Sequence, residues 1–334
     1  MTHWTPYVFY LYLLIPTLLA LAACSDSSDN AAEREKMPSS DEAPASEEAS
    51  GELTTLAYNV AGLPQEVSQV NPQKHIPLIS PLLNDYHIVL TQEDFDWWQP
   101  ALGQLDFANY HARLRAKVDH PHQSERHPGP EAVGIDVATE RPMLQVGDGL
   151  GILSRFPFDE FRRVPWETCG ESAADCLAMK GFAMARVELA SGLNVDVYNL
   201  HADAGSEDSD IAARAAGFVQ LAAYIQEHSA GHAIILGGDT NLHTDPGSDD
   251  PLDREDARVW ETFLAQTGLV DVCDALDCGD PTSIDKFAFT SGGGIDLEPL
   301  AWKFEVEKFR DAEGEPLSDH DALAVRWRWS ATRD

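Results

Sequence analysis

Short polar side chains follow an apolar run in the second half of the chain. Residues Ile234 to Leu236 are followed by two glycines and then by Asp239, Thr240 and Asn241. A short, branched apolar run that ends at glycines predicts a buried strand, so Asp239 and Asn241 are expected where this strand leaves the core. A carboxylate and a carboxamide two residues apart can reach the same small anionic group. An Asx turn that closes the strand is the alternative interpretation.

Other candidate side chains lie at the ends of predicted strands or in adjoining turns. They are Asn59 after 53–58, Glu93 after 86–91, His201 after 193–200, Asp285 in 282–289, and Asp319 and His320 before 324–329. Carboxylate and carboxamide oxygens suit Mg²⁺, Mn²⁺ or Ca²⁺, and such a cation stabilises charge on phosphate oxygens. A histidine whose other ring nitrogen contacts a carboxylate can take a proton from water. The set predicts hydrolysis of a phosphate ester.

Strands and helices alternate along the part of the chain that carries these residues. Residues 208–228 place apolar side chains at intervals of three and four, as in an amphipathic helix, and 72–83 and 253–266 are further predicted helices. Additional strands are predicted at 149–154 and at 181–189, the second forming a hairpin with 193–200. A histidine at a strand exit is poorly explained by core packing, so His201 favours chemistry over a core role.

The composition fits a large globular protein with a strong negative charge. The 334 residues are 43% apolar and include 8 Trp and 13 Phe, enough for one large domain or two small ones. Fifty-six acidic residues against 23 Lys and Arg give a formal net charge of -33. This excess repels polyanions and argues against non-specific nucleic-acid binding unless cations or a local basic patch intervene. The acidity can also serve solubility alone.

The N-terminal residues have the pattern of an export signal. An apolar segment from Val8 to Leu21 runs into the sequence Leu21-Ala22-Ala23-Cys24, which resembles a bacterial lipobox. It predicts a signal peptide at 1–23, lipidation of Cys24 and a location in the cell envelope, with outer-membrane sorting. No Lys or Arg precedes the apolar segment, and an uncleaved anchor or an ordinary cleaved signal are the alternatives. Residues 24–51 are predicted to form a disordered acidic tether. The catalytic domain is expected to span 52–334.

Two segments could surround a substrate. The aromatic residues Phe95, Trp97 and Trp98 follow Glu93 at once, and they either line a substrate mouth or pack in the core. Residues 113–147 form a long polar segment, which predicts a functional rim or disorder. Its three histidines could bind zinc but lack carboxylate or cysteine partners at regular ligand spacing: His120, His122 and His127.

Four cysteines follow Cys24, and export would permit disulfides between them. Three connectivities are possible. The simplest has two short-range pairs, Cys169 with Cys176 and Cys273 with Cys278. A four-cysteine zinc site would need tighter paired spacing, so disulfides are preferred.

Several short motifs, in order, resemble those of the endonuclease/exonuclease/phosphatase superfamily, the deoxyribonuclease I-like fold. They are Tyr58-Asn59-Val60, Gln92-Glu93, Asn199 to Gly205, Gly238 to Asn241, Ile284-Asp285 and Ser318-Asp319-His320. The segment 149–157, Lys180-Gly181 and the stretch 201–205 are most similar to the secreted sphingomyelinase-like branch. The resemblance implies a four-layer α/β/β/α sandwich of two packed, mostly antiparallel sheets with helices outside, and a site at one end of the sheets.

The resemblance also implies roles for the metal and the base. Glu93 and Asn59 would bind a catalytic cation, expected to be Mg²⁺ with Mn²⁺ or Ca²⁺ possible, and Asp319 would assist or hold its water. His320 would act as the general base, oriented by Asp285.

The remaining residues would handle the phosphate and the water. By resemblance, His201 would bind the scissile phosphate or protonate the leaving group, Asp239 would orient the water, and Asn241 would donate a hydrogen bond to the phosphate. Lys286 stands where many relatives have an aromatic residue, which bears on the surroundings of Asp285.

The leading hypothesis is a phosphodiesterase, expected to be monomeric, that acts on a phospholipid or another small phosphodiester. The shortage of basic residues weighs against nucleic acid as a partner without excluding it, and an extracellular endonuclease is the alternative. A phosphomonoesterase for sugar or inositol phosphates comes third. A non-catalytic surface module is the remaining reading, although none of the expected polar residues is missing.

Overall fold

A computed structural model describes residues 49–65, 68–95, 110–135, 146–170, 175–245, 247–280 and 282–332. The predicted signal peptide, Cys24, nearly all of the tether, Trp97 and Trp98 lie outside these ranges. Within them, no helix is both long and apolar enough to cross a membrane.

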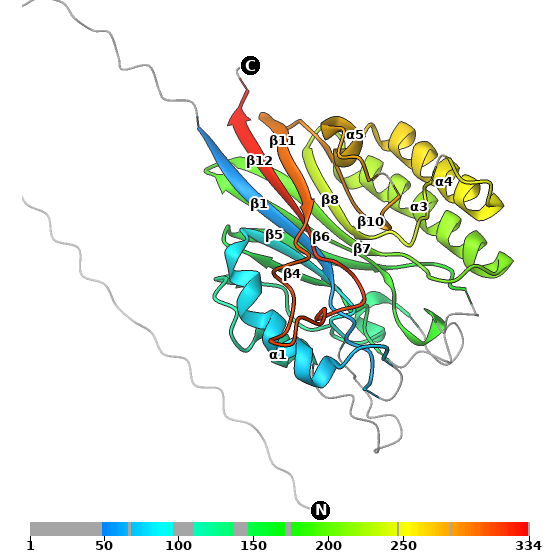
Figure 1. Cartoon of the computed structure of the whole chain (residues 1–334). Coiled ribbons are helices and arrows are strands. Elements are labelled where there is room, and N and C mark those ends of the chain that lie inside the picture. The colour runs from blue at the N-terminus through cyan, green and yellow to red at the C-terminus, as the bar shows by residue number, and fades with distance from the viewer. Residues whose placement is uncertain are drawn as a thin grey trace, which may run out of the picture. The chain divides into compact units, whose positions relative to one another are not determined.

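Two sheets of six strands each form the centre of the domain (Figure 1). The first has the order β11 (Ile295–Phe304), β12 (Leu323–Ala331), β1 (Ser50–Asn59), β2 (Ile88–Gln92), β4 (Gly151–Ser154) and β3 (His122–Gln123). The second has the order β5 (Phe158–Pro165), β6 (Gly181–Ala190), β7 (Leu193–His201), β8 (Ala233–Asp239), β10 (Asp285–Thr290) and β9 (Val270–Asp271). Within each sheet one central pair is parallel, β1 with β2 and β7 with β8, and the other pairs are antiparallel.

Helices cover the outer face of each sheet. The helices α1 (Pro72–Leu82) and α2 (Tyr110–Arg115) pack on the first sheet, and α3 (Asp208–His228) and α4 (Pro251–Thr267) pack on the second. Figure 1 shows α1 on one side of the strands and α3 and α4 on the other. A short α5 (Val272–Leu276) and three 3₁₀ turns, Leu83–Asp85, Glu131–Val133 and Asp175–Leu177, complete the elements. The predicted four-layer sandwich is confirmed.

Alternating side chains on β7 show how the layers are held together. Val195 and Val197 face the other sheet and join the core between the two sheets, whereas Tyr198 and Leu200 lie among side chains of α3 and α4. All four are buried. Full burial of an aliphatic side chain stabilises a fold by about 1.5–3 kcal/mol. Both faces of β7 therefore contribute to the core, and its end is held rigidly.

Some predicted boundaries were shifted. A 3₁₀ turn at Leu83–Asp85 precedes β2, which begins at Ile88 and not at Tyr86. The segment 113–147 holds the end of α2, β3 and a 3₁₀ turn in its described part. Phe95 is buried against Val146 and Ala178, so its role is packing.

The three histidines of this segment have separate surroundings. The Nε2 atom of His120 lies 2.8 Å from the carbonyl oxygen of Tyr86, and Nδ1 of His127 accepts a hydrogen bond from the amide of Gly129. The ring of His122 lies beside Phe158. They do not converge on one point. Both short-range disulfides are present, Cys169–Cys176 and Cys273–Cys278.

Candidate active site

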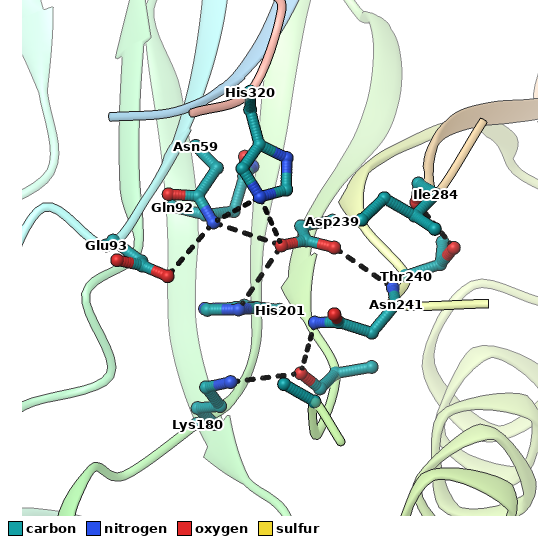
Figure 2. A network of polar contacts seen from close by, with 12 residues as sticks. Asn59, Gln92, Glu93, Lys180, His201, Asp239, Thr240, Asn241, Ile284 and His320 are labelled. Carbon is teal, nitrogen blue, oxygen red and sulfur yellow. Dashed lines mark hydrogen bonds and ion pairs between the residues drawn. The ribbon is translucent and has the colours of Figure 1, made fainter. Parts of the chain in front are cut away.

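The two parallel strand pairs deliver polar residues to one end of the sandwich. Asn59 pairs with Gln92 at the ends of β1 and β2, and His201 pairs with Asp239 at the ends of β7 and β8. Hydrogen bonds then cross between the sheets. The Asn59 side-chain Nδ2 donates to Oδ2 of Asp239 over 3.0 Å, and Nε2 of Gln92 donates to Oδ1 of Asn199 over 2.6 Å. The strand ends thus meet in one polar cluster (Figure 2).

Asp239 is both a turn residue and a site residue. Its Oδ1 accepts the amide N–H of Asn241 over 3.0 Å, which is the predicted Asx turn. Its Oδ2 faces the site, 3.4 Å from Nε2 of His201 and 3.7 Å from Nε2 of His320. The preceding Gly238 has φ +141°, and a Cβ there would lie 2.2 Å from the carbonyl oxygen of Leu200. Only glycine lets β8 approach β7 closely enough to place Asp239 here.

His320 and Asp285 form a hydrogen-bonded pair. The Nδ1 atom of His320 lies 2.8 Å from Oδ2 of Asp285, which leaves Nε2 directed toward Asp239. Burial alone would lower the pKa of His320, but the carboxylates of Asp285, Asp239 and Asp319 raise it to about 10. Burial raises the pKa of Asp285 to about 6, against the lowering effect of His320. The ring orientation is therefore fixed by a buried carboxylate.

Lys286 does not intrude on this pair. Successive residues of a strand point to opposite faces, and Lys286 lies on the helix side of the sheet, where its Nζ donates to Oγ1 of Thr244 over 2.8 Å. Its ammonium group also stands over the ring of Trp260. The Lys286 side chain is thus packed on the face of β10 away from Asp285.

His201 lies beside Lys180, which was absent from the predicted site. Burial and the charge of Lys180 hold the pKa of His201 well below its usual value, so its ring is neutral. Burial alone would lower the pKa of Lys180, but Asp175, Glu93 and Asp239 raise it. Lys180 Nζ lies 2.5 Å from Oδ1 of Asp175 and donates to the carbonyl oxygen of Ala202.

The Asn241 amide Nδ2 donates to this same carbonyl of Ala202. Because an NH₂ group carries two N–H donors, one remains for a ligand. The signal that could have identified Lys180 is a charged residue directly before the apolar strand β6, an unusual position for a buried side chain.

Glu93 and Asn59 face each other at the edge of the cluster. Nδ2 of Asn59 donates to Oε1 of Glu93 over 3.1 Å, while Oδ1 of Asn59 accepts the amide N–H of Ala61. Burial raises the pKa of Glu93, which Lys180 partly offsets. Asp319 is exposed next to His320.

The donor set fits a hard divalent cation. Three carboxylates, of Glu93, Asp239 and Asp285, point into one region, and Oδ1 of Asp285 is buried without a partner among the described residues. Asp239, Asp285 and His320 also have one ligand atom each within 4.8 Å of one another. Asp285 and His320 already bind each other, which leaves Glu93 and Asn59 as the better cation holders. For Asn59 to present its oxygen to a cation, its amide must rotate and give up the bond to Ala61.

A buried ion pair supports the turn that carries Glu93. The next residue, Asp94, accepts hydrogen bonds from Arg115 over 2.5 Å and from Thr91 over 3.3 Å, and its carboxylate is fully buried. Its amide donates to the carbonyl oxygen of Gly149. Burial alone would raise the pKa of Asp94, but Arg115 and His111 lower it to about 2.

We expect Arg115→Ala to lower the free energy of unfolding by about 3–5 kcal/mol, because the buried Asp94 carboxylate loses its guanidinium partner and keeps only His111 and Thr91. In the wild type, the depressed pKa of Asp94 contributes stability above its unfolded pKa, which is lost as the pH falls from about 4 toward 2. Urea unfolding at neutral and acidic pH measures both effects. The control is Arg328→Ala, whose exposed pair with Glu298 is worth about 0–1 kcal/mol. Equal losses in the two variants would contradict this account.

The structure brings together seven of the eight predicted site residues in contacts that link both sheets. They are Asn59, Glu93, His201, Asp239, Asn241, Asp285 and His320. The eighth, Asp319, lies at the rim, where its Oδ1 accepts a hydrogen bond from Ser318.

Comparisons with known proteins show the family to which the chain belongs. Residues 56–320 match the Endonuclease/Exonuclease/phosphatase family. A protein named sphingomyelinase from Mycobacterium tuberculosis is 30% identical over 298 residues, which is 84% of this chain and 54% of that protein. The chain thus spans about half the length of the curated relatives it matches.

Solved structures share the fold. Beta toxin from Staphylococcus aureus with bound magnesium ions superposes with a TM-score of 0.56 at 16% identity, covering 82% of this chain and 99% of that one. Sphingomyelinase C from Streptomyces griseocarneus gives 0.55 at 18% identity, covering 84% of this chain and 100% of that one.

Proposed function

The chain belongs to the endonuclease/exonuclease/phosphatase family, and we propose that it is a divalent-metal-dependent phosphodiesterase acting on a phospholipid of the sphingomyelin class. The observation that carries the reaction class is the Asp285–His320 pair, with Nε2 of His320 aimed at the Asp239 carboxylate. The similarity to a sphingomyelinase over most of this chain supports the choice of substrate.

The proposed reaction begins with a water molecule between His320 and Asp239. The two atoms that would hold it, Nε2 of His320 and Oδ2 of Asp239, are 3.7 Å apart. Asp239 accepts one hydrogen bond from the water and aims its lone pair at phosphorus, while His320 takes the other proton at Nε2. As the water oxygen bonds to phosphorus, the bond from phosphorus to the leaving alcohol oxygen breaks, and that oxygen takes up a proton from solvent. Asp285 stabilises the imidazolium that forms, because its Oδ2 accepts the Nδ1–H.

His201, Asn241 and Lys180 would hold the phosphate. The lowered pKa of His201 favours hydrogen bonding from a neutral ring over proton transfer from a cation. Asn241 offers its second amide N–H, and Lys180 adds a buried positive charge close to His201 and Glu93. Donors fixed before the substrate arrives stabilise the charge that builds up on the phosphate oxygens.

We assign the cation to Glu93 and Asn59, with Asp319 at the rim as an assisting group. Bound there, Mg²⁺ or a similar ion would neutralise negative charge on the phosphate oxygens and the leaving group. The cluster carries more carboxylates than cations, which favours such an ion. Its charge would also oppose protonation of His320 and so favour the neutral base.

A nuclease is the second candidate, since the family includes endonucleases. The net charge of -33 weighs against binding of long polyanions.

We also propose that Cys24 is lipidated and holds the enzyme at the cell envelope, because the sequence Leu21-Ala22-Ala23-Cys24 resembles a lipobox. An unmodified Cys24 in the mature protein, seen by mass spectrometry, would refute the anchor.

A substrate panel tests the proposed specificity. With Mg²⁺ present, we expect phosphocholine release from sphingomyelin vesicles, and at least about tenfold slower turnover of duplex DNA or inositol phosphates. Chromatography of the products separates phosphocholine, nicked DNA and free phosphate. Nicked DNA with intact lipid would establish the nuclease instead, and free phosphate from inositol phosphates would establish a phosphomonoesterase.

A further inference from the structure

A pocket lies at the edge of the second sheet, among residues that the proposed mechanism does not use. It has a volume of about 460 Å³ and is bounded by the segment 125–133, the edge strand β5 and the last turn of α3. We call it the Arg162 pocket and define it by six of its lining residues: Arg126, Phe161, Arg162, Val164, Tyr224 and His228. Pockets that bind small molecules in proteins have about this size.

The lining is cationic although the protein is strongly acidic. Among the residues that the structure describes, three arginines and one histidine line the pocket, against a single carboxylate, that of Glu125. The whole chain has 56 acidic residues and only 23 Lys and Arg. A concentration of positive charge in a recess of an acidic protein focuses a local attraction for anions.

Arg163 builds one wall of the pocket. Its guanidinium donates to both carboxylate oxygens of Asp148 over 2.6 Å and to the carbonyl oxygen of Glu125 over 2.6 Å. These bonds fix the segment 125–133 against β5, and they neutralise the charge of Arg163. The attraction for a ligand must therefore come from Arg162 and its neighbours.

Arg162 is exposed and makes no ion pair with any residue in the described ranges. Glu160, two residues before it in the chain, is held by Arg186 over 2.9 Å. His228, at the end of α3, lies with its ring 4.1 Å from the ring of Tyr224. An anion in the pocket would thus meet cationic and aromatic groups without displacing an existing partner of Arg162.

The rest of the wall is apolar. Phe161, Val164 and the ring of Tyr224 line it, together with Pro128 and Val133. The hydroxyl of Tyr224 is buried and has no hydrogen-bond partner among the described residues. Side chains of this kind suit hydrocarbon or an aromatic ring better than a hydrated inorganic ion. The pocket therefore fits an anion that is attached to an apolar body.

We propose that the Arg162 pocket is a second ligand site, separate from the candidate active site, which binds a phosphate group carried on an apolar moiety. Arg162 supplies the main contact to the phosphate, with Arg126 and His228 beside it, and Phe161 and Val164 receive the apolar part. The ligand is either the headgroup of an anionic phospholipid or a soluble organic phosphate, since both present the same chemistry. The proposal does not depend on the substrate of the active site.

Calorimetric titration of the full chain tests the proposal with three probes: dihexanoyl phosphatidic acid, dihexanoyl phosphatidylcholine and inorganic phosphate. The variant is Arg162→Gln, and the matched control is Arg328→Gln, an exposed arginine on β12. We expect phosphatidic acid to bind the wild type, and Arg162→Gln to weaken this binding by about tenfold or more, because a charge-assisted hydrogen bond is lost. Arg328→Gln should bind as the wild type does.

Vesicles of phosphatidylcholine with and without phosphatidylglycerol then distinguish the two sources of the ligand. If Arg162→Gln, but not Arg328→Gln, loses binding to the vesicles that contain phosphatidylglycerol, the ligand is a lipid headgroup. If Arg162→Gln still binds these vesicles and loses only the binding of dihexanoyl phosphatidic acid, the ligand is a soluble organic phosphate. Any contribution of the N-terminal apolar segment is common to all variants and cancels in the comparison. Equal affinities of Arg162→Gln and Arg328→Gln for phosphatidic acid, or an equal loss of phosphatidylcholine and phosphatidic acid binding in Arg162→Gln, would overturn the proposal.

Discussion

Replacement of His320 by alanine is expected to lower kcat by about 10²–10⁴-fold, the range typical of a lost general base. His320 has no substitute in the cluster, because the other histidine, His201, has a strongly lowered pKa and no carboxylate on its Nδ1 among the described residues. Initial rates of phosphocholine release measure the effect, and thermal unfolding verifies the fold. His243→Ala, an exposed histidine that follows the Asn241 turn, is the control. Comparable losses in the two variants would remove His320 from the mechanism.

The Asp285 carboxylate, which contacts His320, affects the pH dependence of the reaction. The negative charge of Asp285 is one cause of the raised pKa of His320, and a base acts only when it is deprotonated. Asp285→Asn should therefore move the acidic limb of the pH profile of kcat/KM to lower pH. The maximal rate should fall as well, because the ring loses its orienting acceptor. An unshifted limb would mean that another group titrates in the profile.

Replacement of Glu93 by glutamine is expected to raise the Mg²⁺ concentration needed for half-maximal activity by about a hundredfold or more. Glutamine keeps the shape and removes the negative charge, and a carboxylate contributes several kcal/mol to the binding and action of such a cation. Excess Mg²⁺ should restore part of the activity. Rate measurements across a Mg²⁺ series test this, with Glu298→Gln on β11 as the exposed control. An unchanged Mg²⁺ dependence would show that the cation is held elsewhere, for example at Asp239.

Much of the fold could be predicted from the sequence because its signals are local. The apolar alternation of β7 and the three-and-four spacing of α3 depend only on neighbouring residues, and both elements were predicted with nearly correct bounds. The start of β2 was not, because the chain bends at Tyr86 and His87, between the 3₁₀ turn Leu83–Asp85 and the strand. Boundaries of this kind depend on tertiary packing.

The candidate site was predicted from strand-end positions, since parallel neighbours such as β7 and β8 bring their ends together. Lys180 was missed as a site residue because its contacts depend on distant segments. Its partner Asp175 lies near the Cys169–Cys176 disulfide, and Ala202 follows β7. The dual use of Asp239, one oxygen in the turn and one in the site, also could not be separated before the structure was known.

The central claim is that a divalent cation and the His320 cluster together cleave a phospholipid phosphodiester bond. The most direct measurement is release of phosphocholine from sphingomyelin by the full chain, with Mg²⁺, with EDTA, and with Mg²⁺ restored after EDTA. We expect release with Mg²⁺, none with EDTA and recovery on restoration. In His320→Ala, the release with Mg²⁺ should be slower by about 10²–10⁴-fold. Release that persists in EDTA, or no release at all under conditions where the protein is folded and Mg²⁺ is saturating, would contradict the account.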